Sequence, residues 1–270
     1  MNKRQIHIVT WIAVVILLVV LIVSVKSYDA DMECKSVELN IDTNQQYCFL
    51  TKEELIKEID ATGEVLQGQK IKDLELDMIE SMLEDNIYVR NADVFITVDG
   101  IVKINVQQRR PLVRISNAYD ERYFLDDFGR IMPLNPEHAA RTIIANGYIP
   151  ETINDIKDID ADMDNYSDSL KQYNFHYKIF KLVQYIEKDE FWNAQITQIY
   201  INKNKEFELI PLVGSHIIVL DDPLDNLELK FENLKLFYDQ GLNKVGWDRY
   251  KYINISIENQ VVCTLRDSLL

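Results

Sequence analysis

Hydrophobic and polar residues follow three different patterns along this chain: an unbroken apolar run, helical periodicity and strict alternation. The unbroken run, IVTWIAVVILLVVLIVSV at residues 8–25, contains no charged side chain. Its length is at the lower limit for a helix that crosses a hydrocarbon core of about 30 Å. A cleaved signal peptide would have a shorter apolar centre and small residues at its cleavage site. We therefore expect a retained transmembrane helix at Ile8–Val25.

Charges flank this run unevenly and predict its orientation. Lys3 and Arg4 precede it, whereas Lys26 is soon followed by a series of acidic residues that begins at Asp29. Positive charge before a span keeps the N-terminus in the cytoplasm. We expect a cytoplasmic tip at residues 1–7, a polar stalk at 26–35, and the remainder of the chain outside the membrane.

The first external region, residues 36–111, combines the helical and the alternating patterns. Residues 36–41 alternate like a strand, and Thr51 with Glu54 has the spacing of a capping box at a helix N-terminus. A second helix is expected at 73–84, and alternating strands follow at 88–98 and 101–107. Asp99-Gly100 between these two strands is a strong hairpin signal. The order strand, helix, helix, strand, strand predicts two helices on one face of a small three-stranded sheet.

The second external region, residues 112–266, is predicted to be mostly strand. Helical periodicity is limited to about 171–188 and 224–238. The strand-like segments are 112–116, 122–126, 130–134, 141–149, 194–202, 206–212, 216–221, 250–257 and 260–266. The predicted fold class is α+β: a transmembrane helix, a strand-helix-helix-strand-strand domain, and a mostly antiparallel β domain with flanking helices and a tail at 267–270.

The charge of the chain excludes several classes of partner. Its formal net charge is −15, and the basic first 28 residues leave −18 for the rest. A surface this negative repels phosphate backbones and anionic lipid headgroups. We therefore expect no nucleic-acid partner, and contact with the membrane only through Ile8–Val25.

Sequence motifs of catalysis and metal binding are absent. The four histidines are isolated, and no Ser-x-x-Lys, Gly-x-Ser-x-Gly or phosphate-loop motif occurs. The alternating aspartates from Asp158 to Asp164 resemble a calcium loop but lack its glycine and its final glutamate. We expect a solvated acidic segment at 155–168, no metal, no cofactor, no catalytic residue, and therefore no enzyme.

The cysteines allow two interpretations. Cys34 and Cys48 flank a short strand-like stretch and could form a disulfide in an oxidising compartment. Two buried thiols explain them equally well. Cys263, within VVCTL, is typical of a small apolar residue in a strand.

Three of these features together resemble a known family. The anchor, the strand-helix-helix-strand-strand order and the segment DGIVKINVQQRRPLVRI at 99–115 resemble the bacterial cell division family FtsQ/DivIB. YFLDDFGRIMP at 123–133 is similar to a hairpin of that family, and GWDRY at 246–250 is similar to its Bacteroidetes branch. The resemblance implies a POTRA domain at 36–111 and the family's β domain at 112–266.

The resemblance also implies a function. Such a protein is a non-catalytic scaffold of the divisome in the cell inner membrane, mostly periplasmic and located at the division septum. It recruits FtsB-like and FtsL-like single-span proteins, and other divisome members are further candidate partners. In the family a partner strand extends the C-terminal strand, which implies a partner-binding set of Gln260, Val261, Val262, Cys263, Thr264, Leu265 and Arg266.

Two alternatives stay open from the sequence. The segment 260–266 is also typical of an ordinary final strand that is already covered. The alternative function is a membrane-anchored envelope sensor or transport accessory whose POTRA-like domain binds a peptide.

Overall fold

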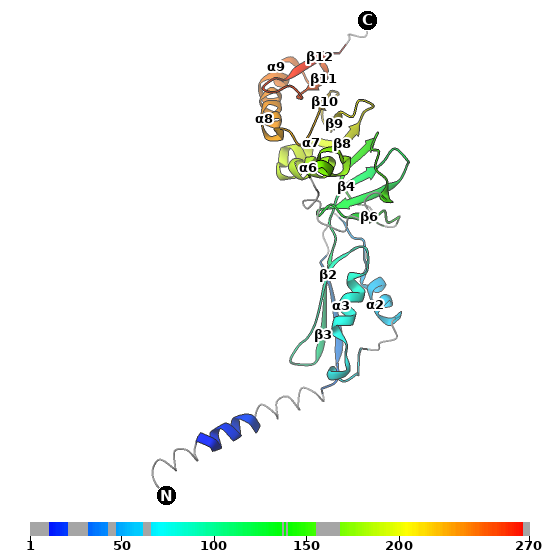
Figure 1. Ribbon diagram of the computed structural model, residues 1–270, viewed down its shortest axis with the longest axis vertical. Helices are drawn as coiled ribbons and strands as arrows, with labels where there is room; N and C mark the ends of the chain where they lie inside the picture. The colour runs from blue at the N-terminus through cyan, green and yellow to red at the C-terminus, as the bar shows by residue number, and fades with distance from the viewer. Residues whose placement is uncertain are drawn as a thin grey trace. The chain divides into compact units, whose positions relative to one another are not determined.

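The chain divides into two compact units, each with its own hydrophobic core. The computed structural model describes residues 11–20, 32–42, 47–61, 66–136, 138, 140–154 and 168–266, without the side chains of 168–170. The first unit comprises residues 1–44 and 48–108, and the second comprises 45–47 and 109–270. Figure 1 labels the elements of both units.

The N-terminal apolar run is described only in part. Residues 11–20 are helical, and their side chains are exposed. Across the described ranges, no helix is both long enough and apolar enough to cross a membrane. Residues 8–10 and 21–25, the two ends of the expected span, lie outside those ranges, so the transmembrane helix stays a prediction. The tip at 1–7, the tail at 267–270 and the aspartates Asp158–Asp164 also lie outside them.

The first unit has the predicted order of strand, helix, helix, strand and strand. Its sheet has the order β1-β3-β2, with β1 parallel and β2 antiparallel to the central β3. The helices α2 and α3 lie beside one another along this sheet (Figure 1). The elements are β1 (Ser36–Asp42), α2 (Lys52–Ala61), a 3-10 turn (Ile71–Asp73), α3 (Leu76–Glu84), β2 (Val89–Ile96) and β3 (Ile101–Gln108).

Local signals explain where these elements begin and turn. The Glu54 carboxylate accepts from the Thr51 N–H at 2.8 Å, and the Glu54 N–H donates to the Thr51 hydroxyl at 3.2 Å. This reciprocal pair is the predicted capping box and fixes the start of α2. Gly100 has φ +83°, the left-handed conformation that the turn between β2 and β3 requires.

Alternation in β3 places the core of the first unit on one face of the sheet. Val102, Ile104 and Val106 are buried against Leu55 of α2 and Leu83 of α3. The residues between them lie on the other face, where they make polar contacts to β1. Asn105 accepts there from the Asn40 amide, and the Lys103 ammonium lies 3.4 Å from Glu38.

The second unit is one nine-stranded mixed sheet. Its order is β12-β11-β10-β9-β8-β7-β4-β5-β6, with three parallel pairs (β4–β7, β7–β8 and β10–β11) among otherwise antiparallel neighbours. The strands are β4 (Pro111–Ser116), β5 (Arg122–Asp126), β6 (Ile131–Pro133), β7 (Ile143–Gly147), β8 (Ile196–Ile201), β9 (Phe207–Pro211), β10 (Ile217–Leu220), β11 (Tyr250–Asn254) and β12 (Val262–Leu265).

Helices connect two of the parallel pairs and cover the sheet. The chain passes from β7 to β8 through α5 (Asp168–Tyr173), α6 (Phe175–Lys188) and α7 (Glu190–Gln195), and from β10 to β11 through α8 (Leu227–Phe237). Crossovers between adjacent parallel strands are right-handed, which brings both connections to the same side. Figure 1 shows α6, α7 and α8 along one side of the strands. Phe180, Trp192 and Phe231 join the strands in one core there.

The helices of the second unit differ from the prediction in two places. The single helix expected at 171–188 is interrupted at Asn174, whose side-chain oxygen accepts from the Tyr177 N–H at 2.9 Å and begins α6. Residues 190–195 form the short helix α7, begun by Asp189, although 194 and 195 were expected to belong to a strand. Six residues are too few to show helical periodicity, so the sequence pattern missed α7.

Candidate partner-binding edge

The strand predicted to bind a partner lies at one end of the nine-stranded sheet. β12 pairs antiparallel with β11, and no second strand pairs with it in the part of the chain that the structure describes. The strand at the opposite end, β6, has only three residues and ends at Pro133, which lacks a backbone donor. An unpaired strand edge is a template to which another chain adds a strand, and β12 has such an edge.

The hydrogen bonds of β11 determine which residues of β12 face the free side. Ile255 donates its N–H to the Val219 carbonyl of β10 at 2.9 Å. Backbone groups alternate in direction along a strand, so those of Ile253 also point toward β10. Those of Tyr252 and Asn254 point the other way, toward β12.

The free backbone groups of β12 therefore belong to Cys263 and Leu265. Thr264 pairs with Tyr252 and Val262 with Asn254, so the backbone groups of these two residues are used within the sheet. Arg266 follows the same alternation, because its N–H donates to the Arg249 carbonyl at 3.0 Å. An added strand would thus bond to Cys263 and Leu265, and not to Val262 or Thr264.

The side chains of the predicted set divide between the core and the surface. Val261 and Cys263 pack against the core of the second unit. Val262 is 43% exposed and Leu265 is 57% exposed. Gln260 precedes the strand in a turn, where its N–H donates to the Ile257 carbonyl. Partial burial raises the pKa of the Cys263 thiol, which keeps that thiol protonated.

The end of β12 is attached to the loops that lead into β10 and β11. The Arg266 guanidinium donates to the Ser215 carbonyl, and the Ser215 hydroxyl donates to Asp248 at 2.6 Å. These contacts join the residues before β10 and the residues before β11 to the last described residue of the chain. No local sequence signal indicates these contacts, because the partners are far apart along the chain.

A buried aromatic cluster packs in the core of the second unit beside β10. His216, fully buried at the start of β10, has its Nε2 2.6 Å from the Tyr238 hydroxyl. The Tyr238 ring packs edge-on against Trp192 and Trp247, with centroid distances of 5.3 and 5.2 Å. Burial lowers the pKa of His216 and raises that of Tyr238, so both side chains are neutral near pH 7.

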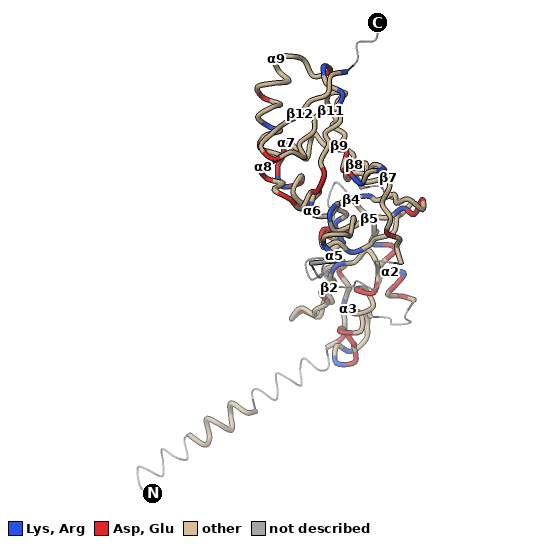
Figure 2. Tube along the Cα trace, turned by 45° about the horizontal axis from the view of Figure 1, so that its top comes forward, with Lys and Arg blue, Asp and Glu red and all other residues tan. Residues whose placement is uncertain are grey.

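The charge around this edge is opposite to that of the whole chain. Between residues 242 and 266 there are four basic and two acidic side chains, in a protein of net charge −15. Figure 2 shows blue segments at β11 and β12. This basic corner of the second unit, the segment 242–266, attracts negative charge. The basic residues are Lys244, Arg249, Lys251 and Arg266.

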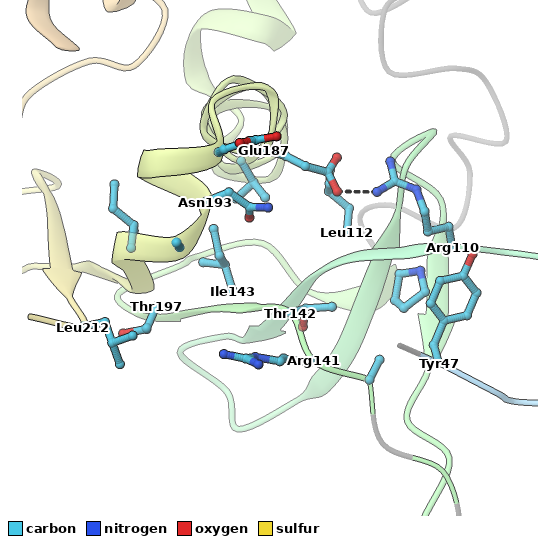
Figure 3. A pocket seen from close by; sticks show the side chains of 16 residues that line it. Tyr47, Arg110, Leu112, Arg141, Thr142, Ile143, Glu187, Asn193, Thr197 and Leu212 are labelled. Carbon is cyan, nitrogen blue, oxygen red and sulfur yellow. Dashed lines mark hydrogen bonds and ion pairs between the residues drawn. The ribbon is translucent and has the colours of Figure 1, made fainter. Parts of the chain in front are cut away.

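A pocket of about 510 Å³ lies elsewhere in the second unit, at the N-terminal ends of β4, β7 and β8. Figure 3 shows Arg110 joined to Glu187 on one side, with Arg141, Thr142 and Asn193 around the remaining space. Arg110 also contacts Asp127 at 3.2 Å, so this arginine bonds neighbouring carboxylates within its own unit. Its described lining contains no histidine, cysteine or serine.

The remaining sequence candidates give no second site. Cys34 and Cys48 are free thiols, so the possible disulfide between them is not formed in this structure. Each sulfur instead donates to a carbonyl two residues later, at Ser36 and at Leu50. No group of three or more metal-ligating side chains occurs within the described ranges.

Two family models match this chain. Residues 110–264 match the model described as FtsQ/DivIB, C-terminal related, which covers more than half of the protein. The chain belongs to the FtsQ/DivIB family. Residues 32–107 match the model of the POTRA-like domain, in agreement with the strand-helix-helix-strand-strand order of the first unit. No curated protein matches the chain.

Family membership agrees with the fold described above. The chain is a mixed α+β protein with a POTRA-like domain and a large β-sheet. The FtsQ/DivIB family is a family of non-catalytic cell division proteins, which connects this chain to division. The sheet of the matched region ends at β12, which pairs only with β11 among the residues that the structure describes.

Proposed function

We propose that this protein is a non-catalytic scaffold of the bacterial divisome. In this proposal Ile8–Val25 anchors it in the inner membrane with the N-terminus in the cytoplasm, and the external units bind FtsB-like and FtsL-like single-span proteins at the septum. One observation carries the proposal: in this FtsQ/DivIB chain β12 lies at the end of the nine-stranded sheet, and no second strand pairs with it among the described residues.

The chemistry of this edge favours strand addition. The backbone groups of Cys263 and Leu265 supply hydrogen bonds that any extended segment can use, whereas the side chains of β12 select among segments. Exposed Val262 and Leu265 offer apolar contacts, and the basic corner favours acidic residues in the partner. Attachment of Arg266 to Ser215 holds the strand in place before the partner arrives, which reduces the entropy cost of binding.

Localisation in dividing cells tests the proposed class of function. A fluorescent protein fused to the cytoplasmic N-terminus of the full chain is expected to form a band at midcell before constriction. Depletion of the protein is expected to produce filaments with unfinished septa. A uniform envelope signal together with normal septation would contradict the divisome role.

The alternative role as an envelope sensor or transport accessory makes a different prediction for the same depletion. Septation would continue, and protein export or the envelope stress response would change instead. A groove beside β1 in the POTRA-like unit is the observation that favours this alternative.

A further inference from the structure

The two edge strands of the small sheet in the POTRA-like unit, β1 and β2, differ in how well they are protected against the addition of another strand. Along β2, the Glu80 carboxylate accepts from the Val94 N–H at 2.7 Å, and the Glu84 carboxylate accepts from the Ala92 N–H at 3.2 Å. Both carboxylates come from α3. Because these side chains occupy the outward donors, β2 is closed to an incoming strand.

The edge at β1 lacks such protection in its middle. Val94 of β2 points away from β3, so its aligned residue Ile104 points toward β1. Ile104 is aligned with Leu39 in the parallel pair, so it bonds to the residues on either side of Leu39, which are Glu38 and Asn40. The backbone groups of Val37 and Leu39 therefore point outward. Within the described part of the chain, no hydrogen bond to the outward backbone groups of Val37 or Leu39 is found. An incoming strand would find these groups unpaired.

The chain itself begins a strand pairing at this edge and then discontinues it. Cys34 faces the same outward side, where its N–H donates to the Gln69 carbonyl and its carbonyl accepts from the Gly68 N–H, both at 2.8 Å. Among the described residues this pairing stops at Cys34, so the outward groups of Val37 and Leu39 form a short unpaired stretch at the centre of β1.

A groove of about 570 Å³ runs beside this stretch, between β1 and α2. Its floor and walls are largely apolar, with Val37 and Leu39 from β1 and Ile56 and Ile59 from α2. Val37 and Ile56 are 37% and 48% exposed, unusual values for apolar side chains that face each other across a hollow. Charged side chains stand at the rim, where Lys52 and Asp60 mark the two ends of α2.

These features specify the occupant. A helix would leave the backbone groups of Val37 and Leu39 unsatisfied, whereas an extended segment satisfies them and turns every second side chain into the groove. The described residues between 32 and 108 include fifteen acidic and seven basic side chains. Long-range attraction therefore favours a basic segment over an acidic one.

We propose that β1 accepts an extended, positively charged peptide with alternate apolar side chains, as a fourth strand of the POTRA-like sheet. This second docking site is separate from β12 and has the opposite charge preference. The proposal does not depend on the divisome role, because it rests on contacts within the first unit alone.

Binding of a defined peptide to the full chain tests this proposal. The probe is a fluorescent peptide, blocked at both ends, that alternates valine with lysine and threonine; its counterpart carries glutamate in place of lysine. Ile56→Glu places a charge in the groove at a half-exposed site. Met78→Glu is the matched control, because Met78 is 42% exposed on α3 and does not line the groove.

We expect the basic peptide to bind and to slow hydrogen exchange in residues 36–42 but not in 89–96. Ile56→Glu should weaken binding roughly tenfold, and Met78→Glu less than about twofold, since only the first disturbs the apolar contact. Val37→Glu should act like Ile56→Glu and provides a second variant if the first does not fold.

Three results would overturn the proposal. The basic peptide does not bind, Ile56→Glu and Met78→Glu weaken binding equally, or the slowed exchange occurs at β2 or β12 instead of β1. Equal binding of the acidic peptide would refute the charge preference.

Discussion

The guanidinium of Arg266 donates a hydrogen bond to the backbone carbonyl of Ser215, which joins the end of β12 to the loop before β10. Ser215 in turn donates its hydroxyl to Asp248, in the loop before β11. The last described residue of the chain thus connects both loops that precede the strands beside it. The edge strand is held in a fixed register by these contacts, although it has a neighbour on one side only.

Removal of this connection should loosen β12 without unfolding the unit. For Arg266→Met we expect a stability loss of about 0.5 kcal/mol and faster amide exchange at Thr264, because one hydrogen bond is lost at an exposed site. Lys251→Met is the matched control, because it removes a charge from an exposed position on β11. It should leave the amide exchange rate of Thr264 unchanged. Equal effects of both variants would show that charge, and not the hydrogen bond, holds the strand.

Stability of the second unit should fall on acidification because of His216. Burial lowers the pKa of His216 in the folded state, so the unfolded state binds more protons below an ordinary histidine pKa of about 6.5. The stabilisation is fully present above that value and is lost as the pH falls toward the folded pKa. Denaturant titrations of the wild type and His216→Gln between about pH 7.5 and 5.5 measure this, and the variant should show the flatter dependence. Parallel curves would contradict the assignment.

Cys263 should react slowly with alkylating reagents. Burial raises its pKa, so less thiolate is present at any given pH than for a free cysteine. We expect its iodoacetamide modification, followed by peptide mass spectrometry, to be several-fold slower than that of an unstructured cysteine peptide at pH 8. Addition of a partner that extends β12 should slow it further. Modification as fast as that of the free peptide would show that this strand is not packed as described.

The capping box of α2 should contribute measurably to the first unit. Thr51→Ala removes the hydroxyl that accepts from the Glu54 N–H and should reduce the free energy of unfolding by about 1 kcal/mol. Thr51→Ser keeps the hydroxyl and should cost only a few tenths of a kcal/mol. Thermal or denaturant unfolding of the two variants gives the comparison, and equal losses would remove the capping role.

Local sequence patterns were enough to predict the helices and strands of the first unit and their order along the chain. The Thr51 capping box and the turn at Gly100 depend on residues at most three positions apart, so the sequence contains the whole signal. The start of α3 was wrong by three residues because Ile71–Asp73 forms a separate 3-10 turn that the apolar pattern does not distinguish.

The arrangement of the second unit depends on contacts that the sequence pattern does not contain. Alternation located β11 and β12 as strands, but it does not indicate that α8 returns the chain parallel to β10, or that β12 is then left at the end of the sheet. Which backbone groups of β12 are free depends on the bond from Ile255 to Val219, a contact across the crossover. The segment 260–266 was therefore predictable as a candidate, whereas the roles of Cys263 and Leu265 were not.

The contact between His216 and Tyr238 was not predicted either, and the reason is similar. His216 was judged an isolated histidine, since no residue near it in the sequence indicates a partner. Its neighbour Tyr238 lies at the end of α8, where the helix continues as a π-helical turn (Tyr238–Leu242). Only the folded crossover brings the two side chains together.

The most direct test of the central claim is the affinity of the full chain for the external region of an FtsB-like partner from the same cell. Leu265→Pro removes an outward N–H from β12, whereas Leu265→Ala shortens the same side chain and keeps that N–H. Proline is tolerated at an edge position whose N–H faces solvent, so the fold should persist, and circular dichroism checks this.

We predict that Leu265→Pro weakens binding by roughly tenfold or more relative to Leu265→Ala, because it removes one backbone hydrogen bond and obstructs the adjacent pairing. Equal affinities of the two variants, or no binding by the wild-type chain, would contradict the proposal that β12 is the partner edge.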